Sequence, residues 1–355
     1  MKIHSWTGAL FGLAAAALFG ASTPLAKLLL GAVDPWLLAG LLYLGSGLGL
    51  FVWRLVSLMV RQRTSEAPLR RADLPWLAGA IVAGGVIAPV LLMIGLSSTA
   101  ASTAALLLNL EGLATMSIAW LVFRENADNR IVLGALAILA GATLLSWRGD
   151  VGNVSFGALA IAGACLAWGI DNNLTRKLSN ADPVQIAMAK GLIAGAVNLT
   201  LALMRGAHLP SALPALAAGC VGLLGYGVSL VLFVLALRHV GTARTGAYFS
   251  AAPFIGATLG IVLFAEPITW QLLAAAGLMG FGLYLHLAET HEHRHTHEAL
   301  EHEHTHVHDA HHQHAHHADD PVGVPHTHWH RHHPLVHSHP HFPDLHHRHT
   351  HDADT

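Results

Sequence analysis

The chain has 355 residues, of which 53% are hydrophobic and 11% charged, and its formal net charge at pH 7 is −2. Soluble domains usually carry about 25% charged residues, so this composition excludes an ordinary soluble protein. Histidine is concentrated at one end, because 25 of the 29 histidines and 10 of the 21 acidic residues lie between His291 and Thr355. The residues before this segment are therefore even more apolar, and the sequence predicts a membrane protein with a polar tail.

Ten apolar segments are long enough to cross a membrane, since a helix needs about 20 mostly apolar residues to span the bilayer core. They are residues 6–30, 35–57, 74–95, 99–122, 130–147, 155–176, 183–204, 213–237, 242–264 and 269–287. The first resembles a signal peptide, but its apolar run continues to Leu30 and further spans follow. We therefore expect an all-α membrane protein with ten transmembrane helices.

The first five spans resemble the second five in sequence. The stretch LFGASTPLAKLL from Leu18 aligns with AWGIDNNLTRKL from Ala167, and the stretch from Gly95 aligns without a gap on that from Ala236. A unit with an odd number of spans enters the membrane in the opposite direction when it is repeated, as in many secondary carriers. The sequence thus predicts two inverted five-helix repeats, residues 1–148 and 149–288, followed by a tail at 289–355.

Lysine and arginine gather in the loops on one side of the predicted bundle. With the N-terminus inside, the opposite side carries only Lys27, Arg148 and Arg205 of the membrane body's basic residues. Cytoplasmic loops of membrane proteins are enriched in Lys and Arg. We therefore expect a multi-pass protein of a bacterial-type inner (plasma) membrane with both termini in the cytoplasm.

Several motifs in these spans resemble the drug/metabolite transporter superfamily, EamA type. They are the five-plus-five plan, the first-helix patterns FG…K and WG…RK, the fourth-helix stretches AALLLNLEG and GAYFSAAP, and the Glu that closes each fourth helix. The resemblance implies a secondary carrier with a site between its halves, and no enzyme activity. The sequence departs from the family pattern at one point. The fourth helix of such repeats often carries Glu-Pro, whereas here one copy has the Glu without the Pro (Glu111-Gly112) and the other has the Pro without the Glu (Ala252-Pro253).

Three ionisable residues lie inside predicted spans, where charges are costly and mark candidate functional sites. Asp171 and Lys190 lie on antiparallel helices at similar depth, about 10 Å from the cytoplasmic ends at 1.5 Å per residue. We expect an ion pair, which either fixes helix packing or forms a gate or substrate contact. Glu111 lies near the middle of its helix. It would suit proton exchange or the binding of a substrate amine, or it forms a hydrogen bond with a neighbouring helix.

Uncharged polar residues in the spans form a second group of candidate substrate contacts. They are Asn109, Asn172, Asn173, Tyr226, Ser229 and Tyr248. Tyr226 and Ser229 are one turn apart and face the same side of a helix. Each has helix packing as its alternative role, but together they predict a polar central cavity.

The tail lacks hydrophobic periodicity and is rich in polar residues, so we expect it to be disordered. Histidine alternates with other residues in its first part. The candidate metal ligands are His291, His293, His295, His297, His302, His304, His306 and His308. Imidazole suits zinc, nickel, cobalt and copper, and a pH sensor or a lipid-headgroup contact is the alternative, since histidine titrates near neutral pH.

The leading hypothesis is an exporter of a small organic metabolite or drug that works by alternating access and has a cytoplasmic metal-binding tail. The alternatives are a carrier of zinc, nickel or cobalt fed by the tail, and a membrane-anchored metal sensor or buffer. No P-loop or CxxC motif occurs, so no cofactor is required and a transition metal is expected only at the tail. We expect small-molecule, lipid and transition-metal partners, no nucleic acid, and a possible homodimer.

Overall fold

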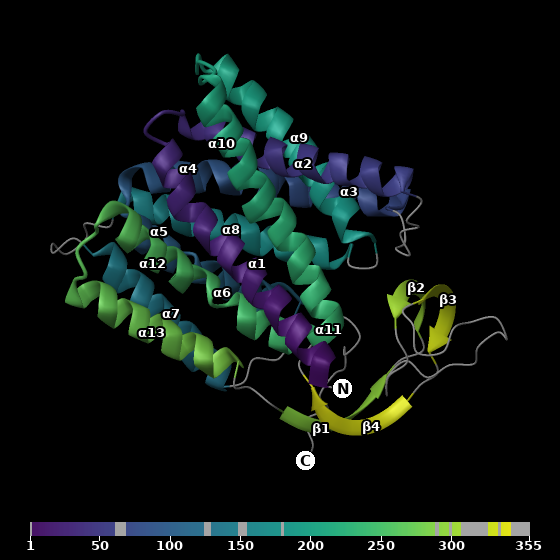
Figure 1. The fold of residues 1–355 in the computed structure, drawn as a ribbon. Coiled ribbons are helices and arrows are strands. Elements are labelled where there is room, and N and C mark those ends of the chain that lie inside the picture. Colours follow the sequence, from purple (N-terminus) through teal and green to yellow (C-terminus); the bar gives the residue numbers. More distant parts are fainter. Residues whose placement is uncertain are drawn as a thin grey trace.

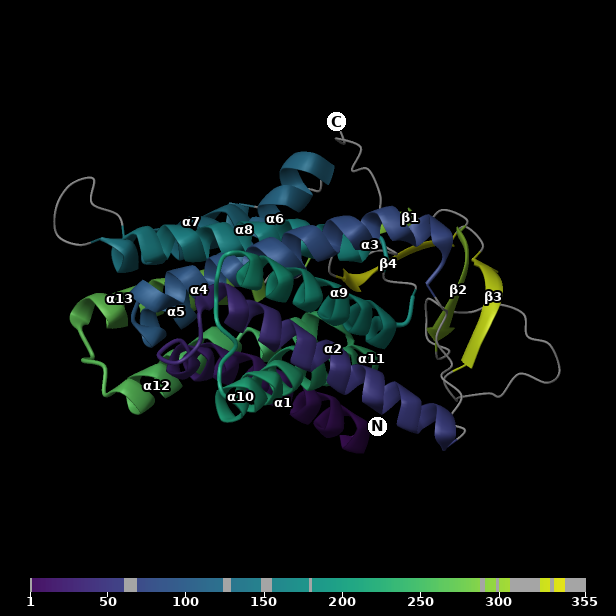
Figure 2. The same ribbon diagram turned by 90° about the horizontal axis from the view of Figure 1, so that it is seen from above.

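The computed structural model consists of a bundle of helices followed by four short strands (Figure 1). It describes residues 2–60, 69–123, 129–147, 155–178, 181–287, 291–297, 300–306, 326–332 and 335–341. Seen from above, α6, α7 and α8 form one outer layer of the bundle and α1, α10 and α12 the opposite one, with α4, α9 and α13 drawn between them (Figure 2). Side chains of both layers meet in a continuous apolar core.

The first half of the bundle contains seven α-helices and two irregular helical segments within the described residues. They are α1 (Lys2–Leu29), α2 (Pro35–Met59), the 3-10 turn η1 (Arg71–Asp73), α3 (Leu74–Ala80), the π-helix η2 (Ile81–Ile87), α4 (Ala88–Ser98), α5 (Ala101–Leu107), α6 (Asn109–Phe123) and α7 (Asn129–Ser146). The segments α3, η2 and α4 follow one another without a break, so they form a single long helix.

The second half follows the same pattern. Its helices are α8 (Phe156–Arg176), α9 (Pro183–Met204), α10 (Ala212–Gly222), the π-helix η3 (Leu223–Val228), α11 (Ser229–Phe249), α12 (Ala252–Phe264) and α13 (Trp270–Leu287). Each half therefore contains one π-helix inside a long helix.

Seven helical stretches of the described chain are long and apolar enough to cross a membrane. They are Thr7–Leu29, Pro35–Met59, Arg71–Ser98, Ala101–Val122, Pro183–Met204, Ala212–Ala236 and Thr245–Phe264. The other three predicted ranges are also helical and correspond to α7, α8 and α13. The chain is thus a multi-pass helical membrane protein, and the number ten for its spans stays a prediction.

One predicted boundary is wrong. We expected a loop between the eighth and ninth spans, near residues 238–241, but the backbone of α11 is helical from Ser229 to Phe249. The expectation was based on the charged residues of this stretch, which contains no proline to end a helix. The interruption comes later, at Ser250 and Ala251, before α12.

The two halves begin their second helices in the same way. Asp34 accepts hydrogen bonds from the backbone of Trp36 (2.9 Å) and Leu37 (3.2 Å) at the start of α2. Asp182 accepts one from the backbone of Val184 (2.9 Å) at the start of α9. In both cases proline occupies the first helical position, where its missing N–H costs nothing. The two Asp-Pro pairs are therefore equivalent helix caps.

The irregular segments also occur at matching positions. The alignment of Gly95 on Ala236 is a shift of 141 residues (236 − 95). This shift places the π-helix Ile81–Ile87 on residues 222–228, where η3 covers Leu223–Val228. It also places Leu108, between α5 and α6, on Phe249, where α11 ends. Both halves thus depart from regular helix at the same two points.

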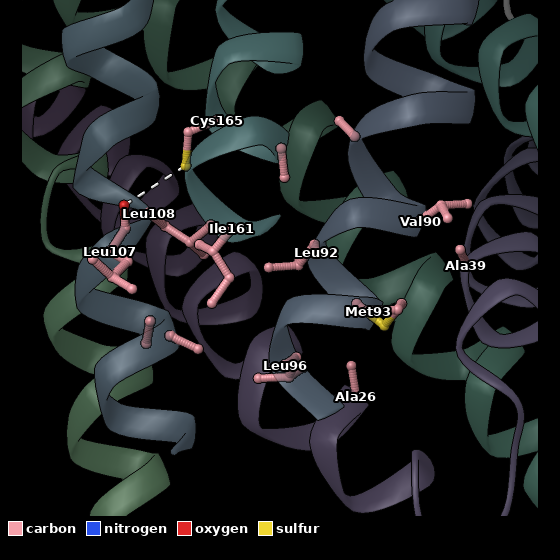
Figure 3. Packing of buried hydrophobic residues seen from close by; sticks show 14 of the residues in the cluster. Ala26, Ala39, Val90, Leu92, Met93, Leu96, Leu107, Leu108, Ile161 and Cys165 are labelled. Carbon is pink, nitrogen blue, oxygen red and sulfur yellow. Dashed lines mark hydrogen bonds between the residues drawn. The ribbon is translucent and has the colours of Figure 1, made fainter. Parts of the chain in front are cut away.

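Helices pack through small residues and a large apolar core. The crossing of α2 and α9 is close enough that a Cβ on Gly191 would lie 2.6 Å from the backbone nitrogen of Gly47. Figure 3 shows the core between α4 and α8, where Leu92 and Leu96 face Ile161. This core surrounds the polar residues described below and holds their helices in place.

Within the tail, the structure describes four short strands. Strands β1 (His291–His297) and β4 (Leu335–His341) pair antiparallel, as do β2 (Leu300–His306) and β3 (His326–His332). The alternation of histidine with other residues in these segments has the two-residue period of a strand, and the disorder expected of the tail as a whole stays a prediction. His308 lies outside the described residues.

We predict that Gly191→Ala lowers the stability of the bundle, because its methyl group would overlap the α2 backbone. Such overpacking typically costs about 1–3 kcal/mol. Gly277→Ala in α13 is the matched control, since its Cβ would meet no atom within 4 Å. The melting temperature of the detergent-purified protein should fall for the first variant and stay equal or rise for the second. Equal melting temperatures would contradict the close crossing.

Candidate functional site

The expected ion pair between Asp171 and Lys190 is present. Lys190 Nζ, on α9, donates to both carboxylate oxygens of Asp171, on α8, at 2.6 and 2.7 Å. Thr175, one turn along α8, donates to Asp171 Oδ1 at 3.0 Å. Asp171 is buried and only 4% exposed. A charge at a buried position is tolerated only when it is paired and hydrogen-bonded. Asp171 and Lys190 therefore each allow the other to remain charged inside the bundle.

The ion pair lies against the π-helix of the first half. A Cβ on Gly84 would overlap the Asp171 carboxylate, and a Cβ on Gly85 would lie 2.6 Å from Ala194 and 3.3 Å from Lys190 Cγ. Only glycine therefore allows α8 and α9 to approach η2 this closely. Neither glycine was predicted to lie at the site, and their signal in the sequence is a Gly-Gly pair inside an apolar span.

Side chains from three helices donate hydrogen bonds to the buried carbonyls of Gly84 and Gly85 in this π-helix. Gly84 O accepts hydrogen bonds from Tyr43 Oη (2.7 Å) and Trp168 Nε1 (3.0 Å). Asn198 Nδ2 donates to Gly85 O at 3.1 Å. A π-helix disturbs the regular hydrogen-bond ladder, and such segments often occur at functional sites. Here α2, α8 and α9 are all anchored to η2.

Glu111 follows the break at Leu108 and lies in the first turn of α6. Its Oε1 accepts a hydrogen bond from Asn172 Nδ2 at 3.0 Å, and the same amide donates to Thr115 Oγ1 at 3.1 Å. Glu111 is half-buried and Asn172 is exposed. The Glu111 carboxylate is also within electrostatic range of Asp171 and Lys190. The expected neighbouring-helix hydrogen bond is therefore present, and Thr115 is a contact that the sequence analysis missed.

The other candidate residues divide between this cluster and helix packing. Asn173 donates to Thr115 O (3.0 Å) and Gly169 O (2.8 Å), which ties α8 to α6. The amide of Asn109 donates to Leu106 O at 2.8 Å, one turn back along the chain. Ser229 is buried and donates to the α1 backbone at Ala15 (2.8 Å).

Tyr248 packs on α1, where a Cβ on Gly12 would lie 3.0 Å from Tyr248 Cβ. Asn109, Ser229 and Tyr248 thus do not join the polar cluster of Glu111, Thr115, Asp171, Asn172 and Lys190.

Aromatic rings continue from the polar cluster into the space between α1, α2 and α11. Tyr43 and Tyr226 lie with ring centroids 5.5 Å apart, and Phe19 lies 6.0 Å from Tyr226. Phe249 lies 5.4 Å from Phe19 and 4.9 Å from Phe233. Both tyrosines are within electrostatic range of Glu111. The cluster therefore has charged groups at one end and an aromatic row at the other.

Two further charged residues hold the junction between α4 and α5. Lys27 Nζ donates to Leu96 O (2.8 Å) and Thr99 O (2.6 Å) at the end of α4. Glu266 accepts hydrogen bonds from the backbone of Ala101 (2.6 Å) and Ser102 (3.0 Å) at the start of α5. A cation at a helix C-terminus and an anion at an N-terminus both stabilise helix ends. Glu266 is the Glu predicted to close the second copy's fourth helix, but no contact was predicted for it.

Metal ligands are not grouped among the described side chains of the helical bundle. Among the residues whose side chains the structure describes, no three His, Cys, Asp or Glu residues lie close enough to hold a metal ion. The tail histidines belong to strands of which only the backbone is described. The metal-binding role expected of the tail therefore stays a prediction.

We predict that Asp171→Asn and Lys190→Met each destabilise the protein more than the double variant does. Removing one partner leaves an unpaired buried charge, which typically costs about 3–5 kcal/mol, whereas removing both leaves none. Melting temperatures of the three purified variants form a double-mutant cycle. Strictly additive effects of the two single substitutions would contradict the ion pair.

Comparison with known proteins agrees with this arrangement. The model of the EamA-like transporter family matches the chain twice, over residues 6–147 and 155–288. An uncharacterized transporter of Methanothermobacter thermautotrophicus is 30% identical over 266 residues, which cover 71% of this chain and 77% of that protein. A solved structure described as "Crystal structure of protein" has the same fold, with a TM-score of 0.58 and 22% identity over 79% of this chain and 95% of that chain.

The residues matched by the family model include Glu111 in the first match and Asp171, Asn172 and Lys190 in the second. The polar cluster is therefore formed by residues from both copies of the family unit. The family is one of transporters rather than enzymes. The chain belongs to the EamA-like transporter family.

Proposed function

We propose that this protein is a secondary carrier that exports a small organic molecule by alternating access. The observation that carries the proposal is the hydrogen bond between Glu111 of the first family unit and Asn172 of the second, 3.0 Å long. Polar and charged side chains within membrane spans are rare and mark substrate or ion pathways. Here they meet where the two units meet, which is where carriers built from repeats bind substrate.

We further propose ten spans arranged as two inverted repeats. Support comes from the paired helix caps Asp34 and Asp182 and from the paired π-helices η2 and η3. Each fourth helix is also interrupted at the equivalent point, before α6 and before α12. Interrupted helices near the membrane centre are typical of substrate sites in such carriers, because they free backbone groups and helix ends.

The end of the bundle with Lys27 and Glu266 is proposed as the closed side. Gly256 and Gly260 of α12 pack against α5 so closely that a Cβ on Gly260 would lie 2.7 Å from the Ser102 nitrogen. In contrast, Cβ atoms on Gly112 of α6 and Gly246 of α11 would meet no atom within 4 Å. We propose that the substrate reaches Glu111 from the side that carries the N-terminus, which the charge bias assigns to the cytoplasm.

Transport assays with Glu111→Gln test the carrier proposal. The purified chain is reconstituted into liposomes, and the movement of radiolabelled amino acids, aromatic amines and nucleosides is measured with and without a proton gradient. We expect that at least one compound moves faster with the native chain than with Glu111→Gln, which has nearly the same shape without the charge. Equal movement of every compound with both proteins would contradict the role of Glu111.

A second proposed function is metal binding by the tail, as an accessory to the carrier. The register of the strands favours it, because His302, His304 and His306 pair with His330, His328 and His326. In the other sheet, His291, His293 and His295 pair with His341, His339 and His337. Residues directly opposite each other on antiparallel strands have Cβ atoms about 4.5–5.5 Å apart. Pairs of imidazoles are suitable ligands for zinc, nickel, cobalt or copper.

We predict that a chain truncated after Glu289 no longer binds these metals but still transports the organic substrate. Calorimetric titration with zinc and nickel measures the binding, and the liposome assay measures the transport. Transport by the full chain should respond to metal, and transport by the truncated chain should not. If truncation instead abolishes metal flux and cellular tolerance to zinc, nickel or cobalt, the protein is a metal carrier fed by its tail.

A further inference from the structure

We propose that the polar cluster selects organic molecules that carry a single positive charge next to an aromatic or similarly apolar body. The inference deepens the carrier proposal and rests on it, since it names the class of substrate that the Glu111 site takes. It is carried by the juxtaposition of one uncompensated carboxylate and a row of aromatic rings.

The charges of the cluster leave one negative charge without a partner. Among the side chains that the structure describes, the charged groups that act on Glu111 are Asp171 and Lys190, so these three groups are two carboxylates and one ammonium, with a sum of −1. Lys190 contacts both oxygens of Asp171, at 2.6 and 2.7 Å. Glu111 Oε1 accepts a hydrogen bond from the neutral amide of Asn172, and among the described residues Oε2 accepts none. The carboxylate that remains is therefore that of Glu111.

An unpaired carboxylate in a membrane protein favours the binding of a cation. Burying a carboxylate costs desolvation free energy, and a neighbouring positive charge that also donates hydrogen bonds offsets this cost. Glu111 is half-buried and its partner Asn172 is exposed, so a ligand has access to this contact. An ammonium group fits because it supplies both the charge and the donors for the free oxygen.

The aromatic row indicates what the rest of the molecule is like. Tyr43 and Tyr226 are within electrostatic range of Glu111, and their centroids lie 5.5 Å apart with the rings tilted by 35°. Tyr226, Phe19 and Phe249 are only partly buried. Ring faces attract organic cations and also pack against flat apolar groups. A molecule bound by its ammonium at Glu111 would thus extend its body along these rings.

Other classes of ligand fit this site less well. An anion would meet the negative net charge, because Lys190 is already bound by Asp171. A neutral molecule would leave Glu111 unpaired, which works against binding. A transition metal prefers imidazole or thiolate ligands, and no such group of three lies among the described side chains. One positive charge on an organic body satisfies both ends of the site.

Three compounds with the same phenyl body and different head groups test the inference. They are 2-phenylethylamine as the cation, 2-phenylethanol as the neutral analogue and 3-phenylpropionate as the anion. Binding to the full-length purified chain is measured by isothermal titration calorimetry. We expect the amine to bind at least about tenfold more tightly than the other two, which corresponds to about 1.4 kcal/mol. Glu111→Gln should remove this preference.

Asp34→Asn is the matched control, because it removes an exposed carboxylate of the membrane body while asparagine caps a helix equally well. This variant should keep the full preference for the amine. The melting temperature of Glu111→Gln is measured alongside, so that loss of binding is separated from loss of folding. If the amine binds no better than the alcohol or the acid, including the case in which none of them binds, the inference is wrong.

Liposome transport of the same three compounds separates this inference from the carrier proposal. If the alcohol or the acid moves in a Glu111-dependent manner and the amine does not, the protein is a carrier but the assignment of a cationic substrate fails. If the amine binds through Glu111 and moves under no gradient, cation binding stands and the carrier proposal fails.

Discussion

Lys190 holds the carboxylate of Asp171 at 2.6 and 2.7 Å, and the placement of the polar cluster depends on this contact. Two opposite charges can remain inside an apolar bundle only in close contact, so this ion pair links α8 to α9 where both helices pack on η2. The pair can reach the first half only because η2 presents Gly84 and Gly85, with no side chain in between. Asn172, the next residue on α8, is thereby brought to Glu111.

Two departures from regular helix in the first half contribute to this arrangement. The π-helix η2 offers carbonyls to Tyr43, Trp168 and Asn198, which draws α2, α8 and α9 together. The interruption at Leu108 places Glu111 at the start of α6 rather than in the middle of a rigid helix. At the other end of α5, Lys27 and Glu266 hold the junction with α4. The site thus lies between the end of the bundle that Lys27 and Glu266 anchor and the less tightly packed region around Gly112 and Gly246.

The sequence was sufficient to predict the helical ranges, the two-fold similarity and the Asp171–Lys190 pair, because hydrophobic length and depth in a span are properties of the chain itself. It did not predict η2 or the interruption at Leu108, since both depend on partners from other helices. The same holds for Asn109 and Ser229, whose polarity marked them as site residues although their partners are backbone carbonyls. The loop expected near residue 240 was wrong because charged residues alone do not exclude a helix.

The most direct test of the central claim is the water accessibility of the polar cluster in the membrane. The chain is prepared with Cys220→Ser and Asn172→Cys, and oriented vesicles are treated with a membrane-impermeant maleimide. We expect labelling at position 172 from one side of the membrane, whereas Asn198→Cys, at a fully buried position, should remain unlabelled. If position 172 is protected from both sides to the same degree as position 198, the cluster is a sealed packing contact and not a transport site.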